Sequence, residues 1–62
     1  MEIIFNTRND IQAAVSDQPI EYGKHGNPTI VEVVSAIQSH PSFHYGSDCS
    51  VVWNAVIDSV LN

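Results

Sequence analysis

The chain has a single cysteine, Cys49, among its 62 residues. It therefore cannot form an internal disulfide, and a domain this short buries too little surface to be more than marginally stable. Chains of this size reach a stable fold through tight helix packing, a bound metal ion or a partner subunit. The length leaves room for one small domain, residues 1–62, and each of the three routes is a hypothesis that the residues must decide.

The balance of charge excludes several partners. Acidic residues outnumber basic ones by seven to two, which gives a net charge of −5. Direct nucleic-acid binding needs several Lys or Arg side chains, but this chain has only Arg8 and Lys24. An anionic membrane surface repels a chain with this net negative charge. No apolar run is long enough to span a membrane, and the first residues lack the pattern of a signal peptide. We expect no direct nucleic-acid binding, no membrane association and a cytoplasmic location.

The first third of the chain predicts a short strand and a small helix. Residues 2–5 are rich in β-formers, which favours a strand. Thr7 and Asp10 have the spacing of a capping box, and apolar residues at helical spacing then predict a helix over about residues 8–17, before a proline. Residues 19–22 are a possible second short strand.

The middle of the chain predicts the first arm of a helical hairpin. Asn27 as N-cap and Pro28 as first helical residue predict a helix over about residues 28–39. We expect it to end there because His40 precedes a proline and is driven out of the helical region. Residues 40–47 then form an aromatic connection.

The last helix is predicted over about residues 48–61, with Ser47 or Asp48 as its cap. Polar residues recur every four positions, and nearly all other positions are apolar. So broad an apolar surface is typical of the central helix of a domain or of an interface. The polar positions are Ser50, Asn54 and Asp58.

Together these elements predict an α+β, helix-dominated fold: a short N-terminal strand, a small helix, a possible second strand and a C-terminal helical hairpin. Two short strands are marginal unless they pack on a helix. An all-α fold is therefore the alternative.

One group of residues has a composition typical of zinc sites, namely His40, His44 and Cys49. Pro41 prevents the two histidines from sharing a helix face, and the paired cysteines common in structural zinc sites are missing. A fourth ligand would have to come from His25 or Asp48. We therefore expect no metal and no other cofactor, and keep a zinc-stabilised module as an alternative.

Cys49 is also the one candidate nucleophile, because a helix N-terminus lowers a thiol pKa and His40 or His44 could act as base. The neighbouring Asp48 opposes thiolate formation, however. A chain this short also has few residues with which to line a substrate pocket. We expect no catalytic residues and no enzyme activity.

The surface composition favours protein contacts. Ser, Asn and Gln total fifteen residues against nine charged ones, and interfaces are poor in charge and rich in aromatic anchors. We expect two groups of contact residues. The partner interface comprises Tyr22, Phe43, His44 and Tyr45. The core and dimer contacts of the last helix comprise Val52, Trp53, Val56 and Val60.

The sequence thus predicts a small acidic, non-enzymatic interaction module. We expect a homodimer that regulates or inhibits a larger protein partner. In size and acidity, and in its lack of catalytic motifs, the chain resembles the small accessory proteins encoded by phages and mobile elements. A further alternative is an acidic nucleic-acid mimic, although its seven acidic residues are scattered along the sequence.

Overall fold

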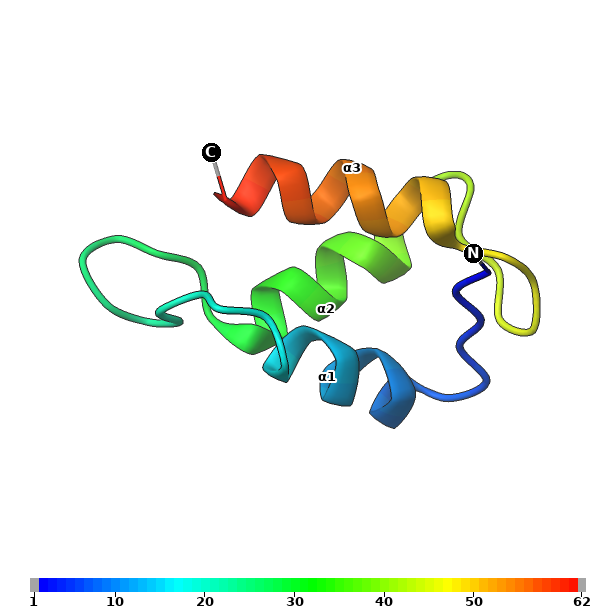
Figure 1. Ribbon diagram of the computed structural model, residues 1–62, viewed down its shortest axis with the longest axis horizontal. Helices are drawn as coiled ribbons and strands as arrows, with labels where there is room; N and C mark the ends of the chain where they lie inside the picture. The colour runs from blue at the N-terminus through cyan, green and yellow to red at the C-terminus, as the bar shows by residue number, and fades with distance from the viewer. Residues whose placement is uncertain (1, 62) are drawn as a thin grey trace.

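The computed structural model describes residues 2–61, which form three α-helices (Figure 1). Their bounds are Arg8–Ser16 for α1, Ile30–Ser39 for α2 and Ser50–Leu61 for α3. Successive helices run in opposite directions. The middle helix, α2, packs on both α1 and α3. The three predicted helices are confirmed, and each is one or two residues shorter than expected at one of its ends. The helix at the centre of the domain is α2, whereas α3 was expected there as one of two possibilities.

Reciprocal capping boxes fix the starts of α1 and α2. At α1, the hydroxyl of Thr7 accepts from the Asp10 N–H at 3.4 Å, and the Asp10 carboxylate accepts from the Thr7 N–H at 3.0 Å. At α2, Thr29 and Glu32 make the same exchange at 3.2 and 3.3 Å. Each box satisfies two backbone donors at a helix end that has no intrahelical partner for them.

The predicted cap at Asn27 and Pro28 was wrong. Asn27 closes the preceding loop instead, because its N–H donates to the Lys24 carbonyl at 2.8 Å and its side-chain amide donates to the Glu21 carbonyl at 2.9 Å. Pro28 then lies just before the Thr29 cap. A Thr–Glu capping box two residues later therefore determines where α2 begins.

The ends of α2 and α3 next to the aromatic connection follow the prediction more closely. His40 is extended, with φ −66° and ψ 135°, as expected for a residue before proline. At α3, the Asp48 carboxylate accepts from the Ser50 N–H at 2.9 Å. The Ser47 hydroxyl donates to the His44 carbonyl instead. Of the two residues expected to cap α3, only Asp48 bonds to the helix start.

The predicted strands are not confirmed, and the all-α alternative fits the described residues equally well. Residues 2–5 make only an isolated antiparallel bridge, between Ile4 and Asp48. The bridge cannot lengthen because Gly46, with φ +79°, turns the neighbouring chain on one side and α3 begins at Ser50 on the other. Residues 19–22 make tight local turns, in which the Tyr22 N–H donates to the Ile20 carbonyl, rather than a strand.

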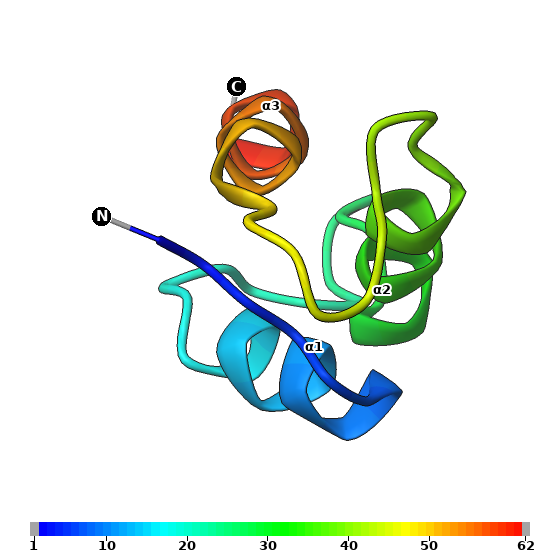
Figure 2. The same ribbon diagram turned by 90° about the vertical axis from the view of Figure 1, so that its right-hand side faces the viewer.

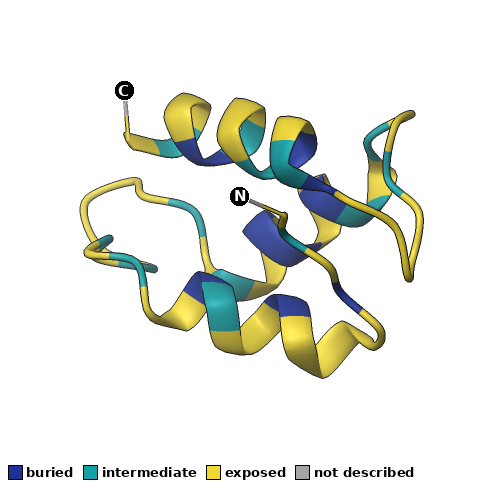
Figure 3. Cartoon of the chain, turned by 45° about the vertical axis from the view of Figure 1, so that its right-hand side comes forward, coloured by how far each residue is buried: buried dark blue, intermediate teal, exposed yellow. Residues whose placement is uncertain are grey.

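The core lies where the inner faces of the three helices meet the N-terminal segment (Figure 3). Its nine buried residues are all apolar or cysteine, and none of the described buried residues is polar or charged. The helices supply seven of them, at spacings of three and four residues on α1 and α2 and of five residues on α3. The buried residues are Phe5, Ile11, Val15, Val33, Val34, Ile37, Cys49, Val52 and Ile57.

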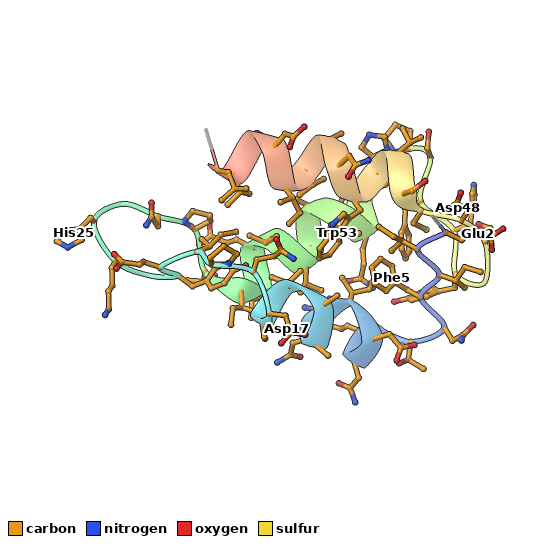
Figure 4. The ribbon with its side chains drawn as sticks, in the orientation of Figure 1. Glu2, Phe5, Asp17, His25, Asp48 and Trp53 are labelled. Carbon is orange, nitrogen blue, oxygen red and sulfur yellow. The ribbon has the colours of Figure 1, made fainter. Side chains whose placement is uncertain are left out.

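The connection between α1 and α2 projects from the end of the helices opposite the N-terminal segment (Figure 1). His25 lies at its outer end (Figure 4) with a positive φ of 52°, between Lys24 and Gly26. The Gly23 N–H donates to the Pro28 carbonyl at 3.1 Å and closes the base of this tip. The connection is thus an ordered loop that extends the molecule to 34 Å along its longest axis.

Candidate interaction surface

The aromatic connection between α2 and α3 presents an ordered pair of rings. Phe43 is half-buried and packs against the core, whereas Tyr45 is 47% exposed. The two rings meet edge to face, with centroids 4.9 Å apart and planes at 79°. This is a favourable geometry for aromatic pairs, because the positive edge of one ring meets the negative face of the other. Phe43 therefore supports the exposed ring of Tyr45 from the side that faces the core.

A polar tether holds the other end of Tyr45. Its hydroxyl accepts a hydrogen bond from the side-chain amide of Gln38, near the end of α2. The carbonyl oxygen of Gln38 accepts in turn from the guanidinium of Arg8, the first residue of α1. The tether joins three separate parts of the chain, so the position of the Tyr45 ring depends on the packing of α1 on α2.

The backbone of His44 fixes the turn that carries these rings. Its carbonyl accepts from the Ser47 hydroxyl at 3.0 Å, from the Ser47 N–H at 3.4 Å and from the Cys49 thiol at 3.4 Å. The His44 side chain itself is exposed. Phe43, His44 and Tyr45, which we name the aromatic patch, thus present two exposed side chains, His44 and Tyr45, and one half-buried side chain, Phe43.

Tyr22, which the sequence also placed at the partner interface, turns inward instead. It is half-buried against the core, and its hydroxyl donates to the Val15 carbonyl at 2.7 Å. Burial raises the pKa of this phenol above its ordinary value. The ring of Tyr22 folds back over α1. We therefore remove Tyr22 from the candidate surface.

The apolar α3 residues that were expected to supply core and dimer contacts pack on the core of their own chain. Val52 is buried, and three others are half-buried against the core. Trp53 approaches Phe5, with ring centroids 6.0 Å apart and planes at 49° (Figure 4). The three half-buried residues are Trp53, Val56 and Val60. The α3 residues that expose apolar surface are instead Val51, at 72%, and Leu61, at 54%.

The candidate metal ligands are not brought together. Among residues 2–61, no group of three or more His, Cys, Asp or Glu side chains is placed to hold a metal ion. The imidazole Nδ1 of His40 accepts from the Ser42 N–H at 3.1 Å. Cys49 is completely buried, and its thiol donates to the carbonyls of His44 and Ser47. The Nδ1 atom of His40 and the Cys49 thiol thus have hydrogen-bond partners within the chain, and the His44 side chain is exposed.

Two carboxylates are held by backbone donors at the N-terminal end of the molecule. Asp10 accepts from the N–H groups of Asn6 and Thr7, and these bonds lower its pKa. The Asp48 carboxylate accepts from the Ile3 N–H at 3.1 Å and the Ser50 N–H at 2.9 Å, which lowers its pKa. A carboxylate that accepts several N–H bonds is favoured in its charged form. Both groups therefore stay negative well into the acid range.

The structure describes no pocket within residues 2–61. None of its three helices is long and apolar enough to cross a membrane. In comparisons with known proteins, no family model, no curated protein and no solved structure matches the chain. The aromatic patch and its surroundings are therefore the features of the molecule that bear on its function.

Two residues that shape this surface, and one exposed apolar residue outside it, were not identified from the sequence. Gln38 and Arg8 position Tyr45, yet they are thirty positions apart and nothing in their local sequence pairs them. Ile4 is a large apolar residue that is 46% exposed. A period-two pattern over residues 2–5, with Ile3 and Phe5 inward, could have identified Ile4 as the outward residue.

Proposed function

We propose that this chain is a non-enzymatic protein–protein interaction module that regulates or inhibits a larger protein, with the aromatic patch as its main contact. The observation that carries the proposal is the exposed but anchored ring of Tyr45, which is held by Phe43 on one side and by Gln38 at its hydroxyl. A role of this kind fits a small accessory protein of the type that phages and mobile elements encode.

Ordering a flexible side chain at an interface costs conformational entropy and weakens binding. A side chain that is already fixed loses little conformational entropy when a partner covers it, so more of its contact energy appears as affinity. Tyr and Trp dominate binding hot spots for this reason and because their rings are large. Residues 40–47 contain no Asp, Glu, Lys or Arg, and charge is depleted at the centre of interfaces.

Self-association is the second part of the proposal. The α3 residues expected to supply both core and dimer contacts pack on the core, so a homodimer would use the exposed side chains of Val51 and Leu61. Native mass spectrometry over a concentration series tests this part. A dimer that is lost in Val51→Asp supports it, and a monomer at every concentration overturns it.

A photo-cross-linking experiment tests the partner contact. The chain carries benzoyl-phenylalanine in place of Tyr45, or in place of exposed Ala13 on α1 as a matched control, and is irradiated in extract of the cells that encode it. We expect one specific adduct from position 45, none from position 13, and competition by unlabelled wild type but not by Tyr45→Ala. Equal labelling from both positions contradicts the proposal.

A further inference from the structure

The N-terminal segment lies along the connection that leads into α3 (Figure 2). It runs beside residues 46–49, and its carbonyls at Ile3 and Phe5 accept from the N–H groups of Cys49 at 2.6 Å and Gly46 at 2.9 Å. Successive residues of an extended chain direct their backbone groups to opposite edges. Ile4, between Ile3 and Phe5, therefore directs its N–H and C=O away from residues 46–49.

Ile4 has the features of an unpaired strand residue. Neither its N–H nor its C=O makes a hydrogen bond to any other described residue, and its side chain is 46% exposed. We name this feature the open edge: the backbone groups and side chain of Ile4. Such an edge is a template onto which another extended chain can add by main-chain hydrogen bonds, with side-chain contacts to give specificity.

The charges around the open edge indicate the chemistry of the added chain. Asp48 accepts from the Ile3 N–H and Asp10 from the Asn6 N–H, so a carboxylate holds each end of the segment. Glu2 is exposed and lies near Asp48 (Figure 4). The basic residue closest in sequence, Arg8, donates to Gln38. Charges act on a neighbouring strand within the Debye length, about 10 Å at moderate salt.

We propose that the open edge binds an extended, basic segment of a partner protein as an added β-strand. An apolar residue of that segment packs on Ile4, and Lys or Arg residues beside it face Glu2 and Asp10. A second copy of the chain fits less well, because two-fold pairing through Ile4 brings the same carboxylates of both copies together. The inference rests on the proposed function only in that the partner is a protein, and it uses residues outside the aromatic patch.

The test uses the full chain, labelled with ¹⁵N, and a capped synthetic peptide of sequence Lys-Thr-Val-Ile-Val-Thr-Lys. We expect this peptide to shift the Ile4 amide resonance and to slow its hydrogen exchange several-fold, with weaker binding at high salt. The control peptide has Glu in place of both Lys residues and leaves Ile4 unchanged. An Ile4 amide that is unaffected by the Lys peptide, or equally affected by both peptides, overturns the proposal.

Variants of the chain separate edge pairing from general attraction. Ile4→Pro removes the N–H but suits an extended backbone, and Ile4→Val keeps the N–H. We expect the peptide to bind Ile4→Val and not Ile4→Pro. Because Ile4→Pro could also disturb the fold, Glu2→Lys provides a second test: it weakens binding of the Lys peptide and strengthens binding of the Glu peptide. Equal affinity of Ile4→Pro and Ile4→Val, or no change in Glu2→Lys, contradicts the inference.

Two further outcomes are decisive. If the Ile4 amide becomes protected without peptide as the protein concentration rises, a second copy occupies the open edge and the proposal of a basic partner is overturned. A specific cross-link from position 45 without any peptide effect at Ile4 overturns this inference alone. A peptide effect at Ile4 without a cross-link from position 45 overturns the role of the aromatic patch instead.

Discussion

The hydroxyl of Tyr22 donates a hydrogen bond to the backbone carbonyl of Val15 at 2.7 Å. Val15 lies in the last turn of α1, where backbone carbonyls have no partner within the helix. The Gln18 N–H donates to the same carbonyl at 3.1 Å. A side chain from the projecting connection thus helps to cap α1, and this bond ties the base of that connection to the helix.

Removal of this hydroxyl is expected to destabilise the fold. Tyr22→Phe keeps the ring in the core but leaves the bond unmade, and a typical hydrogen bond contributes about 1 kcal/mol to the free energy of unfolding. Urea unfolding followed by Trp53 fluorescence measures the loss. The matched control is Tyr45→Phe, whose hydroxyl is on the surface, and we expect it to change stability by less than about 0.5 kcal/mol. Equal losses in the two variants would contradict this assignment.

The stability of the fold is expected to fall in acid. Backbone donors lower the pKa of Asp10 and Asp48 from the ordinary value of 3.8. Each carboxylate therefore contributes stability that is fully present above the unfolded-state pKa and is lost as the pH falls through the lower folded-state pKa. Urea unfolding at a series of pH values from neutral into this range measures the decline.

Asp48→Asn identifies the source of that decline. The amide keeps an oxygen that accepts from the N–H groups of Ile3 and Ser50, but it no longer titrates. We expect this variant to be less stable than wild type at neutral pH and to have a shallower dependence on pH in acid. An unchanged pH dependence would mean that Asp48 makes no differential interaction in the folded state.

Gly46 is expected to be the glycine whose replacement bears most directly on the aromatic patch. Its φ is +79°, and a Cβ built there meets no atom within 4 Å, so space does not limit substitution. An L-residue in this region is strained, so Gly46→Ala should lower the free energy of unfolding by about 1 kcal/mol. Chemical synthesis with D-alanine at position 46 is the control. It adds the same methyl group without the strain, and a loss equal to that of L-alanine would show that backbone conformation is not the cause.

Trp53 is expected to matter to the core more than to an interface. Trp53→Ala removes the ring that packs on Phe5, and because Trp53 is partly exposed the loss should lie near the lower end of the range for large aromatic residues, about 3 kcal/mol. Circular dichroism during thermal unfolding measures it. Val51→Ala, at a largely exposed position of the same helix, is the control and should stay within about 0.5 kcal/mol. A variant at position 53 as stable as wild type would remove Trp53 from the core.

Local signals predicted the helices well. The Thr7 and Asp10 pair gave the start of α1, and His40 before a proline gave the end of α2. Both depend on residues a few positions apart, which interact in the same way in any chain. The N-terminal strand was not confirmed, because a strand needs a partner segment of matching length. Only the fold shows that Gly46 and the start of α3 limit that partner to a single bridge.

The candidate surface was predictable only in part. The aromatic residues of the connection stood out by type, and Tyr45 proved to be exposed. Tyr22 looked equivalent in sequence, but packing turned its ring onto α1. The tether through Gln38 joins residues that are distant in sequence, and such contacts have no local signature.

The sequence by itself determined the helix positions, the apolar faces and the negative charge, because these follow from residue spacing, capping and composition. Tertiary structure decided which helix is central, which tyrosine is exposed and which side of residues 2–5 is unpaired. Those outcomes depend on how the apolar faces pack together, and the burial of one side chain is fixed only when every neighbour has taken its place.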